Sequence, residues 1–189
     1  MACKWALVTE PKNANANGTR DSNQDTQVGS ELVDIGINYT GKFSNMKVAV
    51  GGSYYTSNTE AAAGAAAAAD VDGHSVSAQV SANGVRVGGR YTRHQDIGGA
   101  GLDRTNWRVG ADYSMGALGL GITYQVAAQD RTSSTEDAST YLSVGSSYNL
   151  SPGVQMYGGV LFVTYDDDGG AAANEGDNSF GVLGTKLSF

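Results

Sequence analysis

Basic side chains on the polar positions of alternating segments are the residues of this sequence best suited to chemistry. Arg86 and Arg90 lie in one such segment and Arg108 in the next, and their distances from the intervening loop predict Arg90 and Arg108 side by side. Cationic side chains that face one space select ions by charge. We expect the ionisable residues on polar strand positions to line a water-filled space; the alternative is that each arginine only keeps that surface hydrated. These residues are Lys47, Arg86, Arg90, Arg108, Lys186, Asp34 and Asp112.

Two aspartate-containing loops offer the hard oxygen ligands that Ca²⁺ prefers. The candidate ligands are Asp70, Asp72, Asp166 and Asp168. Neither loop continues into the ligand spacing of an EF-hand, so a solvated acidic loop is the favoured interpretation and Ca²⁺ the alternative. Apart from that alternative we expect no cofactor. The sequence also contains no Ser, His and Asp set suited to nucleophilic catalysis, which predicts a protein that is not an enzyme.

The composition excludes several other classes of protein. The 189 residues carry a net charge of −7 with a sequence pI near 4.6, which argues against a nucleic-acid partner. The single cysteine cannot form an internal disulfide, and no apolar stretch is long enough for a transmembrane helix. The 27 glycines and 10 tyrosines beside only 2 prolines fit many strands better than a helical bundle or a disordered chain.

The candidate residues must be positioned by β-strands, because apolar and polar residues alternate along most of the chain. Residues 85–92, 107–115 and 118–126 show this pattern clearly, which predicts one face in apolar surroundings and one in water. Short connections alternate with long ones, and the short Asn83–Gly84 connection is typical of a type I′ turn. We predict an all-β fold, an antiparallel up-and-down transmembrane barrel of about ten strands. A soluble β-sandwich is the alternative.

Charges and aromatic residues are sorted along the predicted strands. The acidic residues gather in or next to the long connections, while tyrosines occur mostly at strand ends. Aromatic rings at both ends of transmembrane strands form bands at the membrane–water interfaces. Residues 154–165 are apolar at both alternating positions, so their orientation stays undecided. The predicted interfacial aromatic residues are Tyr39, Tyr91, Trp107, Tyr113, Tyr124 and Tyr148.

The last predicted strand ends in Phe189 and has apolar or small residues at every second position before it. These residues are Leu187, Thr185, Leu183 and Gly181. A strand of this kind resembles the last strand of bacterial outer-membrane β-barrel proteins, and the resemblance implies that Phe189 belongs to the signal read by the assembly machinery. The spacing from Tyr148 through Tyr157 to Tyr165 resembles the closing hairpin of alphaproteobacterial general porins.

The resemblance to Gram-negative general porins implies a domain organisation and a function. Residues 1–189 are expected to form one domain, in which residues 1–28 are an atypical strand and loop and residues 29–189 are porin-like strands. They would correspond to the C-terminal portion of a sixteen-stranded porin. The resemblance implies a water-filled channel in the outer membrane of a Gram-negative bacterium, which passes ions and small hydrophilic solutes by diffusion. It also implies contact with outer-membrane lipid and leaves a homotrimer open. A surface protein with a filled lumen, acting as an adhesin or structural module, is the alternative.

Overall fold

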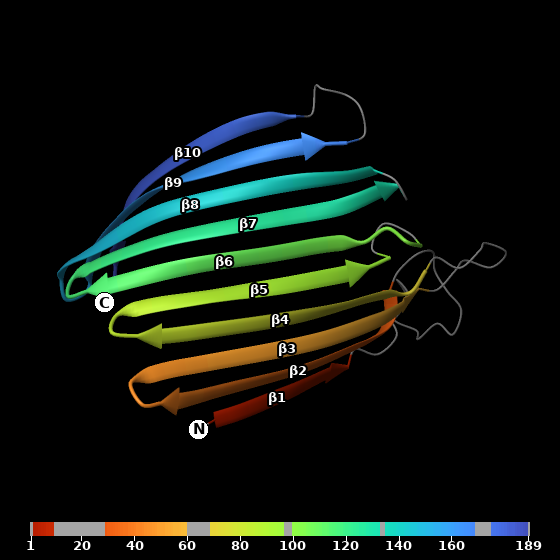
Figure 1. Ribbon diagram of the computed structural model, residues 1–189, viewed down its shortest axis with the longest axis horizontal. Coiled ribbons are helices and arrows are strands. Elements are labelled where there is room, and N and C mark those ends of the chain that lie inside the picture. Colours follow the sequence, from red (N-terminus) through yellow and green to blue (C-terminus); the bar gives the residue numbers. More distant parts are fainter. Residues whose placement is uncertain are drawn as a thin grey trace, which may run out of the picture.

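The computed structural model of the protein describes residues 2–9, 29–59, 69–96, 100–132, 135–168 and 175–188. The predicted strands are present, and they run back and forth in chain order (Figure 1). The ten strands are β1 (Ala2–Thr9), β2 (Gly29–Phe43), β3 (Met46–Thr59), β4 (Val71–Ala82), β5 (Val85–Gln95), β6 (Arg104–Met115), β7 (Leu118–Thr132), β8 (Thr135–Ser151), β9 (Val154–Asp167) and β10 (Gly176–Leu187).

Each strand pairs antiparallel with the next one along the chain, so the all-β, up-and-down prediction is confirmed. The short turns lie at one end of the sheet, together with the N and C labels (Figure 1). The turn at Asn83 and Gly84 has positive φ at both residues, 50° and 81°, as a type I′ turn requires.

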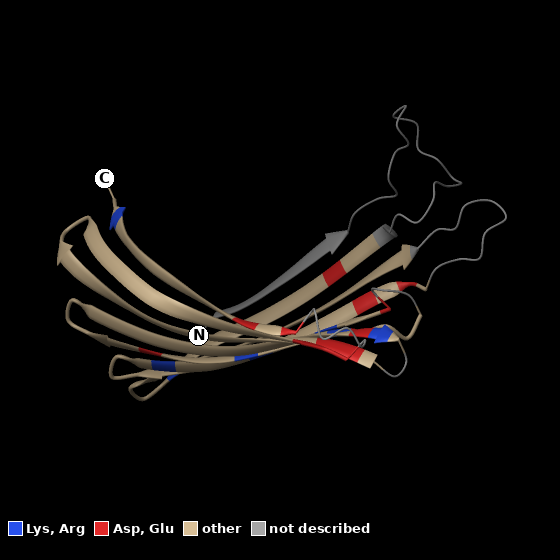
Figure 2. Ribbon diagram, turned by 90° about the horizontal axis from the view of Figure 1, so that it is seen from above, with Lys and Arg blue, Asp and Glu red and all other residues tan. Residues whose placement is uncertain are grey.

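The described strands form one strongly curved sheet rather than two packed layers (Figure 2). β1 and β10 are its two edges, and they do not pair with each other within the described residues. A soluble β-sandwich requires a second sheet to cover the apolar face. A single ten-stranded sheet therefore does not fit the sandwich alternative and matches the wall of a barrel.

The sheet has almost no buried core. Among the described residues only Ala128 and Val163 are buried apolar side chains, whereas residues such as Ile37, Val87 and Ile122 are 48–58% exposed. An apolar patch of this extent marks a surface covered by another apolar phase. Among the described residues there is no helix long and apolar enough to cross a membrane.

The strands extend further than alternation alone predicts, mainly toward the long connections. The predicted long connection at residues 128–137 is largely paired strand, because β7 continues to Thr132 and β8 begins at Thr135. Acidic residues assigned to that connection, such as Asp130 and Asp137, are therefore on strands. Alternation requires an apolar environment on one face, so it disappears where both faces meet water even though pairing continues.

Candidate functional site

The concave face of the sheet carries the polar positions of the predicted strands. One hollow of about 680 Å³ is lined by residues from β2 to β7, among them Asn38, Gln79 and Thr123. A hollow that touches so many neighbouring strands lies on the concave side of the curved sheet (Figure 2). Because successive side chains alternate between faces, every second residue from these positions shares the concave side.

Three cross-strand rows of ionisable residues on β5 and β6 dominate this face. Arg86 lies opposite Asp112, Arg90 opposite Arg108, and His94 opposite Arg104. Successive rows are four residues apart, so they stand about 13 Å from one another along the strands. We call the concave-facing arginines of these strands the basic wall; they are Arg86, Arg90, Arg104 and Arg108.

The row nearest the short turns is neutralised, whereas the middle row is not. Arg86 Nε donates to Asp112 Oδ2 at 2.8 Å, with both side chains about half exposed. Arg90 and Arg108 form no ion pair with any described residue; Arg90 only donates a long 3.4 Å hydrogen bond to Ser75 Oγ. The middle row therefore places two adjacent cations without a carboxylate partner on the concave face.

The third row contains Arg104, which the sequence analysis did not single out. Arg104 donates to Gln129 Oε1 from both Nε and Nη2, at 3.2 and 2.6 Å. Beside it, His94 Nδ1 and the Tyr55 hydroxyl are 2.5 Å apart. Arg104 stands four residues before Arg108 and so has the same orientation, which is the sequence signal that identifies it.

The other predicted ionisable residues occupy separate parts of the concave face. Lys47 lies opposite Lys42 in a hollow of about 750 Å³ that also reaches Arg86. Asp34 lies opposite Tyr55, on β2. Lys186 lies opposite Gln155 in a hollow beside the β8–β9 turn. The structure thus brings the arginines together and leaves Asp34 and Lys186 apart from them.

The register of β8, β9 and β10 resolves the orientation of residues 154–165. Ser143 and Ser147 both point to the concave face. Ser143 lies opposite Leu161, and Leu161 lies opposite Phe180. One residue further along, Val160 lies opposite Val144 on the convex face. The concave positions of β9 and β10 therefore hold large apolar side chains, which we call the apolar wall. They are Tyr157, Leu161, Phe180 and Val182, exposed or partly exposed.

A further hollow lies between the basic wall and the apolar wall. It measures about 660 Å³, and its lining includes Arg86 and Asp112 on one side and Leu161, Phe180 and Val182 on the other. The floor between the walls is nearly free of side chains, because three glycines lie next to one another across β7, β8 and β9. These glycines are Gly121, Gly145 and Gly159.

The predicted interfacial aromatic residues all lie on the convex face, near the ends of the strands. Tyr91 is the cross-strand partner of Trp107, and the Trp107 and Tyr124 rings are 5.4 Å apart. Tyr113 and Tyr148 are exposed near the short turns, and Tyr39 lies on the same face of β2. Their contact with the membrane interface stays a prediction.

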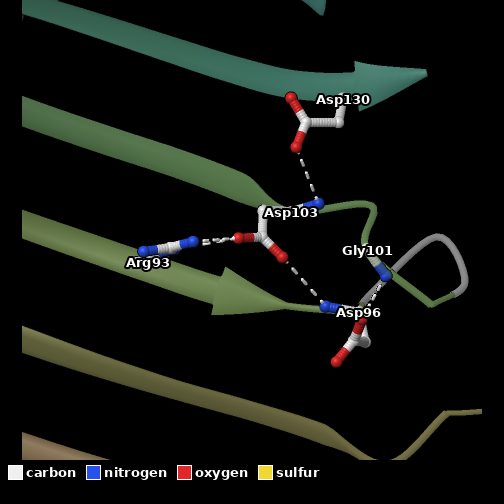
Figure 3. Close-up of polar contacts among 5 residues, drawn as sticks. All are labelled: Arg93, Asp96, Gly101, Asp103 and Asp130. Carbon is white, nitrogen blue, oxygen red and sulfur yellow. Dashed lines mark hydrogen bonds and ion pairs between the residues drawn. The ribbon is translucent and has the colours of Figure 1, made fainter. Parts of the chain in front are cut away.

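A polar network links the β5–β6 connection to β7, further from the short turns than Tyr91 and Trp107 (Figure 3). Arg93 donates twice to Asp103 Oδ2, at 2.9 and 2.5 Å, and these hydrogen bonds to the carboxylate raise the pKa of Arg93. The backbone N–H of Asp103 donates to Asp130 Oδ2 at 3.1 Å, and that of Asp96 donates to Asp103 Oδ1 at 3.3 Å. Gly101 N–H donates to Asp96 Oδ1. Arg93 has the same orientation as Tyr91, so this network lies outside the concave face.

The Ca²⁺ candidates are not brought together. Asp70 and Asp72 lie at the start of β4, whereas Asp166 and Asp168 lie at the end of β9, five strands away. No group of three His, Cys, Asp or Glu side chains able to hold a metal ion is present in the part of the chain that the structure describes. Phe189, the predicted assembly signal, lies outside the described residues.

Comparisons with known proteins agree with this geometry. The sequence profile of the family described as Gram-negative porin matches residues 6–168. The fold is similar to outer-membrane-expressed OmpT of Vibrio cholerae, with a TM-score of 0.58 and 16% identity over 83% of this chain and 56% of that one. It is also similar to the anion-selective porin from Comamonas acidovorans, with a TM-score of 0.51 and 15% identity over 84% and 48% of the two chains.

The trimer form of in-vitro folded Vibrio cholerae OmpT gives a TM-score of 0.51 and 12% identity, and the match covers 99% of this chain and 81% of that one. No curated protein matches the chain by sequence. This chain spans little more than half the length of outer-membrane-expressed OmpT of Vibrio cholerae.

Proposed function

The chain belongs to the family of Gram-negative porins, and from this premise we propose that it forms the wall of a water-filled diffusion channel. Membership of the family places it in the outer membrane of a Gram-negative bacterium. Its convex face then contacts lipid, and its concave face contacts the water and solutes in the lumen. Ions and small hydrophilic solutes pass by diffusion.

The observation that carries the proposal is the opposite character of the two faces of one curved sheet. On β5, for example, Val85, Val87 and Tyr91 point to the convex face, while Arg86 and Arg90 point to the concave face. Lysine or arginine on a lipid-facing strand position costs roughly 2–4 kcal/mol at mid-bilayer, but costs little where the side chain reaches water. Family and fold point to a channel rather than an enzyme, and we propose that the protein has no catalytic activity.

We propose that the middle row of the basic wall gives the channel a preference for anions. Two unit charges about 8 Å from a passing ion contribute about 1 kcal/mol in total at the dielectric constant of water. That free energy raises the partition of anions about fivefold and lowers that of cations about fivefold, so the ratio of the two changes by up to about thirtyfold. The Comamonas acidovorans porin is described as anion-selective, which is consistent with this proposal.

The proposal also covers assembly. One of the similar structures is described as a trimer form, and we propose that this chain also takes part in a homotrimer. The supporting observation in the chain itself is the exposed apolar surface of the convex face, which either lipid or a neighbouring protomer can cover. Chemical cross-linking of the protein in native membranes would test this, with a trimer as the expected largest product and only monomer as the contradicting result.

Reversal potentials in planar bilayers test the channel and its selectivity. We expect the protein to give stepwise conductance in a KCl gradient with a preference for Cl⁻. Arg90→Gln with Arg108→Gln should lower the Cl⁻/K⁺ permeability ratio by up to about thirtyfold. Arg93→Gln is the control, since it removes an arginine charge outside the concave face. Absence of conductance from a folded sample would favour the filled-lumen alternative, and equal shifts for both variants would refute the assignment of the middle row.

A further inference from the structure

The apolar wall is not explained by diffusion of ions and hydrophilic solutes. Phe180 is 57% exposed and Val182 59% exposed, although both lie on the face that the proposed function assigns to water. Tyr157 lies with its ring over Gly184, only 2.5 Å from the place that a Cβ atom of Gly184 would occupy. Hydrating such a surface is unfavourable in proportion to its apolar area, so a solute with an apolar part is favoured over water against it.

The position of the apolar wall relative to the basic wall restricts the chemistry of that solute. The hollow that contains Leu161, Phe180 and Val182 shares Arg86, Asp112 and Thr123 with the hollow that contains Arg90 and Arg108. The two hollows thus form one continuous trough across the concave face. A solute lying in it meets two unpaired guanidinium groups on one side and exposed apolar side chains on the other.

The floor of the trough favours a flat apolar group. Gly121, Gly145 and Gly159 form one cross-strand row, which leaves the backbone open between Asp112 on β6 and Val182 on β10, next to the row of Arg90 and Arg108. Neighbouring strands are about 4.8 Å apart, so β6 and β9, the nearest strands of the two walls, are about 14 Å apart. Side chains that extend from both walls narrow this gap toward the size of a small organic anion.

From this arrangement we propose that the trough binds amphiphilic organic anions, meaning monocarboxylates with an aromatic or branched apolar body. The carboxylate lies against Arg90 and Arg108, because guanidinium groups pair with carboxylates in a directional, charge-assisted way. The apolar body lies against Leu161, Phe180 and Val182. The inference rests on the proposed channel, since it assigns a solute class to the same concave face.

Paired blocking measurements in planar bilayers with the whole protein test this inference. Phenylacetate and acetate have the same charge and differ in the apolar ring. We expect phenylacetate to reduce the KCl current at a concentration about tenfold lower than acetate, since only its ring removes apolar surface from water. Leu161→Asn with Phe180→Asn should abolish this difference between the two anions. Ser143→Ala, in the same cross-strand row, is the matched control and should retain it.

Variants of the basic wall should change blocking by the two anions in a different way from variants of the apolar wall. Arg90→Gln with Arg108→Gln should raise the blocking concentrations of phenylacetate and acetate by similar factors, because both anions lose the same charge contact. Equal blocking by the two anions in the unmodified protein would overturn the proposal. If, in addition, Leu161→Asn with Phe180→Asn lowered the unfolding temperature, the apolar wall would instead pack against another segment of the protein.

A binding measurement separates failure of the inference from failure of the proposed channel. If the folded protein gives no conductance, phenylacetate binding to the protein in lipid vesicles is measured by equilibrium dialysis, with protein-free vesicles as the reference. Binding that is lost in the Leu161→Asn, Phe180→Asn variant and kept in Ser143→Ala would support the trough without a channel. Equal binding by all three proteins would overturn the trough itself.

Discussion

The basic wall on β5 and β6 and the apolar wall on β9 and β10 occupy the same concave face but differ in composition. On β5 every large apolar residue points to the convex face, whereas β9 places Leu161 and Val163 on the concave face. Strict alternation along the sequence identifies the basic wall directly, because charged residues occupy only one of the two alternating sets of positions. The second wall shows that an apolar residue on such a strand need not face lipid. Under the proposed function, the difference between the walls therefore concerns which solutes pass through the channel, not how the sheet is held in the membrane.

The largest expected effect comes from placing a charge on either face of β9. Val160→Lys puts an ammonium group on the convex face and should lower the free energy of unfolding by roughly 2–4 kcal/mol. Leu161→Lys, one residue further, puts the same group on the concave face, where it stays hydrated and should cost much less. Denaturant titrations of both variants folded into lipid vesicles measure the difference. Equal losses would show that the concave face of β9 is not in water.

A smaller effect is expected from closing the floor between the walls. A Cβ atom at Gly159 would lie 2.7 Å from the Val144 carbonyl oxygen and 3.1 Å from Gly145 Cα. Gly159→Ala must therefore shift the backbone of β8, which should cost roughly 1–3 kcal/mol. Gly181→Ala on β10 is the matched control, since no atom lies within 4 Å of its Cβ position. The same vesicle titration applies, and equal stability of the two variants would contradict the close approach of β8 and β9.

Much of the basic wall could be predicted from the sequence, because its position depends only on local patterns. Counting residues outward from the loop between two alternating segments places Arg90 opposite Arg108, and the register shows this pairing. Arg104 was missed because it is the first residue of its strand. The residues next to it are polar, so no apolar residue alternates with it. The ion pair of Arg86 with Asp112 likewise depends on the cross-strand register, which neither residue reveals alone.

The apolar wall could not be predicted, for a physical reason. Alternation assigns orientation only when one set of positions is apolar and the other is polar, and residues 154–165 are apolar in both. Their orientation follows from pairing with β8, where Ser143 and Ser147 are polar and Val144 and Tyr148 are not. The long connections were overestimated because the pairing of β7 with β8 continues where polar or small residues occupy both alternating positions.

The smallest expected effect on stability comes from making the basic wall more basic. Asp112→Asn removes the partner of Arg86, in an ion pair whose side chains are 53% and 48% exposed. Exposed pairs contribute only about 0.2–1 kcal/mol, so the free energy of unfolding should fall by no more than that. The freed Arg86 adds another cation without a carboxylate partner to the basic wall, and the reversal potential in a KCl gradient should shift further toward Cl⁻. Asp103→Asn is the matched control, because it frees Arg93 outside the concave face and should leave selectivity unchanged. A shift toward K⁺ in Asp112→Asn would contradict the contribution of Arg86 to the field in the lumen.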